Sequence, residues 1–147
     1  LVEGGAMLQL GLGGGAIFVA DAAQGIGRAE KTGSNQIPVV VVAAGALGGS
    51  LQGFTVAGEA LYWLAFNAGQ LEVHRSGLDG SGARVLGRVA AKLPTYWNSP
   101  IGPSQLVVDG GFVYFSDPGT IEGDTQAASN LQGVTGAADG AIYRLPQ

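Results

Sequence analysis

The sequence predicts an all-β protein made of short antiparallel strands. Glycine supplies 27 of the 147 residues, hydrophobic residues make up 46% of the chain, and charged residues make up only 12%. Short apolar runs separated by Gly turns are typical of strands, and a disordered chain would lack such runs. One short unit also occurs three times, which indicates a repeated supersecondary element.

The repeated unit consists of an apolar segment, a three-residue turn rich in Gly, and a second apolar or aromatic segment. Its copies begin at residues 10, 54 and 106, so they recur 44 and 52 residues apart. Those spacings match the length of a β-propeller blade, which is a four-stranded antiparallel sheet. The copies are LGLGGGAIFVAD (10–21), FTVAGEALYWLA (54–65) and LVVDGGFVYFSD (106–117).

A further segment follows each copy and predicts a third strand. In it an apolar residue precedes an Arg by two positions, at Ile26 and Arg28, Val73 and Arg75, and Ile142 and Arg144. Hairpin turns are expected next at 31–34 and at 78–82, where Asp-Gly is a strong turn signal. Outer strands follow the first two copies, and the third copy ends before such a strand. The strands expected in the first copy are 10–12, 16–20, 26–30 and 39–43, and the second outer strand is 84–89.

These repeats predict a single β-propeller segment over residues 1–147. Its blades cover about 8–47, 52–91 and 104–147, and the last lacks its outer strand. Propellers typically close with about 4–8 blades, so three blades are an open part of a ring with exposed apolar ends. The remainder comes from a second copy through two-fold symmetry, from another chain, or from another part of the same polypeptide. Because the chain opens with Leu1, we expect it to be an excised piece of something longer.

The stretch GLGGGA (11–16) has a second interpretation as a dinucleotide-binding fingerprint. A nucleotide site requires a helix directly after the glycines and an acidic residue about 20 positions further on. Ile17, Phe18 and Val19 follow instead, and these residue types prefer strands. The sequence therefore predicts that the glycines form a hairpin turn.

Composition excludes several classes of function. The net charge is −4 without a basic cluster, so no nucleic-acid surface is expected. The absence of Cys removes thiol nucleophiles, Cys zinc sites and disulfides. The longest apolar run, 39–47, is far shorter than the roughly 20 residues of a membrane helix, so no membrane span is expected.

The expected outer strand 37–43 is apolar on both faces, whereas outer strands usually show polar residues to solvent. One interpretation is that adjacent blades bury both of its faces. The other is that a partner protein covers this edge.

The second copy resembles a blade of the YWTD-type β-propellers found in the extracellular part of lipoprotein receptors. The resemblance rests on LYWLAFNAGQLEVHRSGLDGSGARVL (61–86), and the Gly-rich composition is more similar to that of secreted bacterial propellers. It implies an extracellular or cell-surface location in a bacterium. It also implies that an Asp after the aromatic pair ties neighbouring blades together. Asp21 and Asp117 match that Asp, while the second copy has Ala65.

Two long loops are the expected binding region. Strand direction alternates along a meander, so the loop 91–104 and the insertion 118–139 fall on one side of the blades. Long loops in compact domains are often functional. Tyr96, Trp97 and Asn98 in the first loop are candidates to stack on a sugar or anchor a partner, or else they cover the blade end as a satellite cluster. Glu122 and Asp124 are partner-binding candidates in the insertion.

No catalytic, metal or cofactor site is predicted. The acidic residues Glu122, Asp124 and Asp139 do not have the spacing of a calcium loop. His74 is the only histidine and lies in an expected strand, which favours a structural role, and GGSLQG (48–53) is not a nucleophile elbow.

We therefore expect a non-catalytic binding or assembly module that presents loops on a rigid propeller face. The expected partner is a protein, by self-association or as another chain that completes the propeller; a glycan is the other candidate. One alternative is a propeller-type hydrolase or lyase with a metal near the central channel. Another is a structural subunit of an extracellular filament or surface complex. Fold alone does not choose among these functions.

Overall fold

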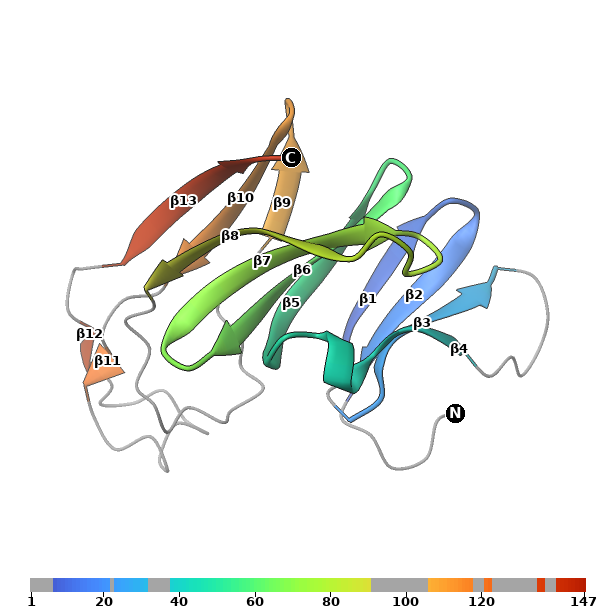
Figure 1. Ribbon diagram of the computed structural model, residues 1–147, viewed down its shortest axis with the longest axis horizontal. Coiled ribbons are helices and arrows are strands. Elements are labelled where there is room, and N and C mark those ends of the chain that lie inside the picture. Colours follow the sequence, from blue (N-terminus) through green and yellow to red (C-terminus); the bar gives the residue numbers. More distant parts are fainter. Residues whose placement is uncertain are drawn as a thin grey trace.

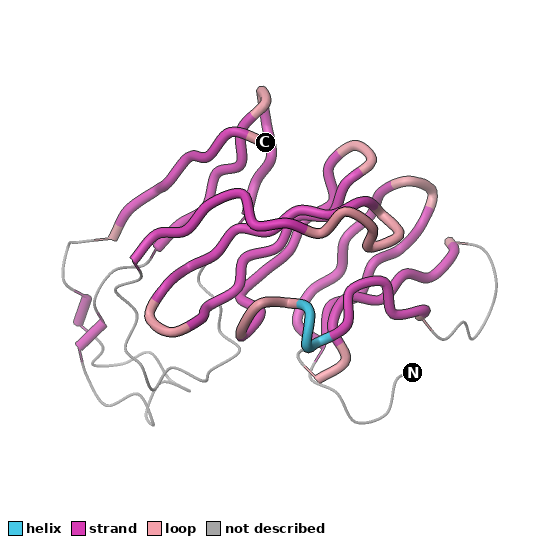
Figure 2. Tube along the Cα trace, viewed as in Figure 1, coloured by secondary structure: helices cyan, strands magenta, loops and turns pink. Residues whose placement is uncertain are grey.

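The computed structural model describes residues 7–21, 23–31, 38–90, 106–117, 121–122, 135–136 and 140–147. In these ranges the protein is all-β, and its sheets are antiparallel throughout (Figure 1). The one helical element there is a short 3₁₀ turn, η1 (Ala44–Ala46), which Figure 2 shows in cyan between long stretches of strand. The predicted all-β class is confirmed.

The first sheet is a four-stranded meander in the order β1-β2-β3-β4. Tight turning is possible between β1 and β2 because Gly14 and Gly15 adopt φ values of +52° and +77°, which favour glycine. The GLGGGA stretch is thus a hairpin turn, as predicted, and the dinucleotide interpretation is wrong. The strands are β1 (Met7–Gly13), β2 (Ala16–Asp21), β3 (Gly25–Glu30) and β4 (Val39–Ala43).

The second sheet repeats this meander in the order β5-β6-β7-β8. Its Leu-Asp-Gly-Ser turn is closed by Gly77 N–H donating to the Ser81 carbonyl at 2.8 Å and by Ser81 N–H donating to Asp79 Oδ1 at 2.9 Å. The strands are β5 (Ser50–Ala57), β6 (Ala60–Asn67), β7 (Gln70–Gly77) and β8 (Arg84–Ala90).

The third sheet has three strands, β9 (Leu106–Asp109), β10 (Phe112–Asp117) and β13 (Ala141–Pro146), in the order β13-β10-β9. A separate two-stranded ladder pairs β11 (Ile121–Glu122) with β12 (Thr135–Gly136). The insertion that we expected to be a loop therefore contains a short two-stranded ladder.

The three sheets stack face to face as successive layers, and the second sheet lies between the other two (Figure 1). Side chains alternate along β6, so Leu61, Trp63 and Ala65 pack toward the first sheet. The intervening Ala60, Tyr62 and Leu64 pack toward the third sheet. Burial on both faces explains why β6 is apolar at nearly every position. Each large side chain buried here stabilises the fold by about 1.5–3 kcal/mol.

The first strands of the three sheets are neighbours, because β1 contacts β5 and β5 contacts β9. Glycine permits the close approach of β1 to β5: a Cβ at Gly11 would lie 2.9 Å from Phe54 Cε2, and one at Gly13 would overlap Val56. A hydrogen bond of 2.8 Å from Phe54 N–H to Gln9 Oε1 also joins these two sheets.

The connection after β4 and the turn between β2 and β3 lie on the same side of the sheets. Ala44 N–H donates to the Gln24 carbonyl at 3.1 Å, which joins the two segments directly. The expectation that connections of these two kinds share one side is confirmed at this position.

The outer strand β4 departs from one expectation. Val39 is 70% exposed and Val40 is 46% exposed, whereas Val42 is buried. Val39 lies on the side of the second sheet, so the interpretation that adjacent blades bury both faces of this strand is wrong at that residue. The second sheet covers the end of β4 next to η1 and leaves its beginning open to solvent.

Candidate functional site

Most of the sequence-predicted partner-binding residues lie outside the described residues. This holds for Tyr96, Trp97, Asn98 and Asp124, and with them for the whole 91–104 loop. Glu122 is the second residue of β11, but its side chain is not described. These residues stay predictions.

Asp21 and Asp117 occupy equivalent positions at the ends of β2 and β10. Asp21 Oδ1 accepts hydrogen bonds from the backbone N–H groups of Ala23 at 2.7 Å and Gln24 at 3.2 Å. This arrangement stabilises the hairpin that contains Asp21 itself. Asp117 is 2% exposed. Their expected role between blades stays a prediction.

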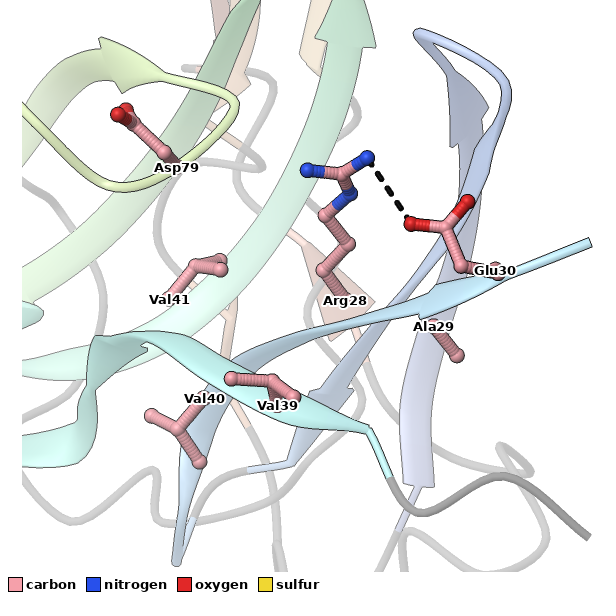
Figure 3. Close-up of a pocket in the computed structure, with 7 residues that line it drawn as sticks. All are labelled: Arg28, Ala29, Glu30, Val39, Val40, Val41 and Asp79. Carbon is pink, nitrogen blue, oxygen red and sulfur yellow. Dashed lines mark hydrogen bonds and ion pairs between the residues drawn. The ribbon is translucent and has the colours of Figure 1, made fainter.

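An open cleft of about 420 Å³ lies beside β3, β4 and the β7–β8 turn. Figure 3 shows the Arg28 side chain in this cleft between Glu30 on the same strand and Asp79 in the turn of the second sheet. The exposed Val39 and Val40 form an apolar wall. The cleft thus combines one guanidinium, two carboxylates and aliphatic surface.

The charged groups of the cleft interact weakly. Arg28 Nη2 lies 3.1 Å from Glu30 Oε1, but their side chains are 36% and 59% exposed, and ion pairs of this kind contribute about 0–1 kcal/mol. Arg28 Nε is buried, and it makes no hydrogen bond with the described residues. Hydrogen bonds from Ser81 lower the pKa of Asp79. Two carboxylates against one guanidinium make the cleft net negative at neutral pH.

A buried polar cluster lies farther along the same interface between the first two sheets. Glu72 and His74 lie on one face of β7, and Arg88 on β8 pairs with Glu72 at 2.7 Å between Nε and Oε1. His74 Nε2 lies 3.2 Å from Glu72 Oε2, yet the geometry is not that of a hydrogen bond, so the contact is electrostatic. Burial lowers the pKa of His74, and Glu72 partly opposes that shift.

Packing holds His74 in place. Its ring stacks on Trp63 across the β6–β7 ladder, with ring centroids 5.1 Å apart. Trp63 Nε1 in turn donates to the Leu47 carbonyl at 3.0 Å, and Gly48 leaves room for the imidazole. With 6% of its surface exposed, the ring is enclosed by the protein. These contacts agree with the structural role that the sequence predicted for His74.

Exposed large apolar side chains also lie at the two ends of the stack. For each sheet we call the side toward the preceding sheet the leading face and the opposite side the trailing face. Leu10 and Leu12 on β1 are 61% and 66% exposed on the leading face of the first sheet. Val107 and Ile142 are 53% and 80% exposed on the trailing face of the third sheet. On the trailing face, β10 lies between the strands that carry these two residues. We treat both end faces as candidate interaction sites.

Sequence reasoning expected exposed ends but named no residue of these two faces as a site. The signal was present in the repeat: Leu10 aligns with Phe54 and Leu106, which are buried, and Ile142 aligns with Ile26 and Val73, which are also buried. A repeat position whose side chain is buried in two copies, but exposed in the copy at the end of the stack, is a candidate contact with another molecule.

In the comparison with known proteins, no family model and no curated protein matches the chain. No helix in the described part of the chain is long and apolar enough to cross a membrane. Within the same residues, no group of three or more His, Cys, Asp or Glu side chains is arranged to hold a metal ion.

Proposed function

We propose that this chain is a segment of a β-propeller and functions as a non-catalytic binding and assembly module. Its three sheets contribute successive blades to a ring, and the loops on one side of the ring contact a protein or glycan partner. The observation that supports this proposal is that the second and third sheets each contact the sheet before them through repeat-equivalent residues.

Repeat-equivalent residues fill the two internal interfaces. Leu61 and Trp63 of the second sheet pack on the first sheet, and their counterparts Val113 and Phe115 of the third sheet pack on the second. The same face of the repeat therefore contacts the preceding sheet at both interfaces. Together with the neighbouring positions of β1, β5 and β9, this supports a radial arrangement around the first strands.

The proposed ligand-binding region consists of the long loops. Tyr96, Trp97 and Asn98 are the proposed anchors, and Glu122 and Asp124 supply polar contacts. Aromatic anchors supply most of the energy in many interfaces, and polar rims fix orientation. The resemblance to YWTD-type propellers supports an extracellular or cell-surface setting for such contacts.

A tandem polypeptide tests the propeller proposal. Two copies of the chain joined by a flexible linker contain enough blades to close a ring, so the end faces become buried within one molecule. We expect one cooperative unfolding transition, with a higher midpoint than that of the dilute single chain. The matched control carries Ile142→Glu in both halves. Equal midpoints for the tandem and the single chain would contradict ring closure.

A second experiment addresses the loops. We expect the whole chain to bind a subset of a glycan array or a defined protein ligand, and Trp97→Ala to abolish that binding. The control is Glu59→Ala, because Glu59 is exposed in the β5–β6 turn and does not belong to these loops. Binding that survives Trp97→Ala would assign recognition to another surface.

A further inference from the structure

We propose that a second copy of this chain covers both end faces, so that two chains close one six-sheet ring with two-fold symmetry. The trailing face of the third sheet of each chain packs on the leading face of the first sheet of the other. This inference rests on the proposed propeller function and adds the identity of the missing blades.

The leading end repeats a surface that is already buried twice within the chain. Leu10 is 61% exposed, whereas its counterparts Phe54 and Leu106 are 1% and 8% exposed. Ile17 and Val19 continue this face on β2, opposite Leu12 and Leu10 in the ladder. In the second and third sheets, the residues at these positions form the contact with the preceding sheet. Among the described residues, the first sheet thus presents the same contact positions with no sheet packed against them.

The trailing end shows the same relation. Ile142 is 80% exposed, whereas its counterparts Ile26 and Val73 are fully buried. Tyr114 and Arg144 also repeat Tyr62 and Arg75, where Arg75 Nε donates to the Tyr62 hydroxyl group at 3.2 Å. In the second sheet that hydroxyl group lies 3.2 Å from Oε1 of Gln147, the residue that follows the last strand of the third sheet. At the open end the Arg144 guanidinium lies over the Phe112 ring, 4.6 Å from its centroid, so the Tyr–Arg pair is repeated there in sequence and register but not in this hydrogen bond.

Side-chain sizes indicate which surface fits the trailing end. At one leading-face position the residue shrinks from Trp63 to Phe115 to Val19. The trailing face of the first sheet, which meets Trp63, has small residues on both sides of one aromatic ring. The trailing face of the second sheet, which meets Phe115, has bulkier side chains. The three trailing segments are Ala16, Phe18 and Ala20; Ala60, Tyr62 and Leu64; and Phe112, Tyr114 and Ser116.

The bulkiest trailing surface therefore lies at one end of the chain, and the least bulky leading surface lies at the other. Close packing requires large side chains to meet small ones across an interface. The first sheet of another copy is thus the complement that the trailing end needs. Because each chain offers one end of each kind, a two-fold axis satisfies both contacts and leaves no end open.

Solution mass is the first test. Light scattering over a dilution series should give twice the 14.7 kDa of one chain. Leu10→Glu and Ile142→Glu should each raise the dissociation constant by about 100-fold or more, because a carboxylate would be buried without a partner. Both positions are exposed in the single chain, so the fold should persist, as circular dichroism can verify. Val39→Glu is the matched control, because Val39 is 70% exposed but lies on neither end face.

A monomer, a larger assembly, or a dimer insensitive to both end-face substitutions would overturn the inference. A monomer would leave the propeller proposal standing if the tandem polypeptide still closed. If the single chain is a monomer and the tandem polypeptide also fails to form a closed ring, both the second-copy inference and the propeller proposal are refuted.

Disulfide trapping tests the geometry directly, because the chain contains no Cys. A Cβ at Gly13 would lie 3.1 Å from the Cβ of Val56, which is shorter than the roughly 3.5–4.5 Å between the Cβ atoms of bridged cysteines, so a disulfide at equivalent positions requires only a small separation of the strands. The equivalent pair across the proposed interface is Asp109 and Leu12. Oxidised Leu12→Cys/Asp109→Cys protein should run as a covalent dimer on a denaturing gel.

The matched control for trapping is Ala57→Cys/Val108→Cys, the equivalent pair between the second and third sheets. It should form an intramolecular disulfide, so the oxidised protein should migrate as a single chain on the denaturing gel. Trapping of the control pair without trapping of the interface pair would overturn the second-copy inference alone. Absence of both disulfides would contradict the stacking on which the propeller proposal depends.

Discussion

Single residues in the second sheet connect the layers of this protein. Trp63 contributes its ring to the core, stacks on His74 and donates a hydrogen bond to the connection that leads into the sheet. His74 in turn approaches Glu72, which Arg88 also contacts. The Trp63 side chain therefore holds the connection between β4 and β5 in place and also forms one wall around His74, the only histidine of the chain.

Titration of His74 can be measured without ambiguity because the chain has a single histidine. Burial lowers its pKa below 6.5, so we expect an NMR titration midpoint under that value. The unfolded chain then binds the proton more readily, and stability falls as pH drops below 6.5. Glu72→Gln should lower the midpoint further, because Glu72 raises the pKa. A midpoint above 6.5 would show that the carboxylate outweighs burial.

Gly13 and Val56 should be energetically coupled across the first interface. A Cβ at Gly13 would overlap the Val56 side chain, so Gly13→Ala should destabilise the protein by about 1–3 kcal/mol. Val56→Ala removes the overlapping methyl groups, and the double variant should be more stable than the sum of the single effects predicts. Urea unfolding of all four proteins measures this coupling. Strict additivity would mean that the two sheets separate to accept the methyl group.

The β7–β8 turn of the second sheet approaches β4 of the first sheet. Gly80 in this turn has a φ of +82°, and a Cβ there would overlap the carbonyl oxygen of Val41. The Gly80 backbone therefore lies close to the backbone of the outer strand of the neighbouring sheet. Such contact fixes the distance between the second sheet and the edge of the first.

Two glycines of this turn offer a matched comparison. Gly80→Ala and Gly82→Ala both place a side chain at positive φ, which costs about 1–2 kcal/mol. Only Gly80→Ala also meets β4, because nothing lies within 4 Å of a Cβ at Gly82. Thermal unfolding should show a clearly larger loss for Gly80→Ala. Equal losses would indicate that the turn does not contact β4 in solution.

Strands and turns could be predicted from sequence because local chemistry determines them. Gly14 and Gly15 permit a tight turn, and the β-forming residues after them favour a returning strand. The exposure of Val39 could not be predicted in this way, because it depends on how far the next sheet extends over the outer strand. The end-face residues were visible in the alignment of the repeats, whereas the cleft around Arg28 arises only when two sheets and a turn come together.

At the scale of the whole molecule, the two end faces of the stack of sheets are not equivalent. Its two ends differ in side-chain size, and both differ from the polar surface expected at the end of a finished sheet stack. The assembly proposal depends on these two end faces. The metal-enzyme alternative depends instead on ligands that converge from several sheets.

Calcium should leave the stability of the protein unchanged. A ligand that binds the folded form raises the unfolding midpoint, and a calcium site needs six or more oxygen ligands. We expect equal midpoints in millimolar calcium and in chelator, measured by differential scanning calorimetry. A midpoint that rises with calcium concentration would favour the hydrolase or lyase alternative and would direct attention to Glu122 and Asp124.

The open beginning of β4 has a consequence for the handling of this protein. Four consecutive valines, 39–42, form the edge strand of the first sheet, and segments of this kind can pair with like strands of other molecules. At neutral pH a net charge of −4 keeps molecules apart. Near the isoelectric point of about 4.7 this repulsion vanishes, and intermolecular cross-β aggregation should begin at this edge.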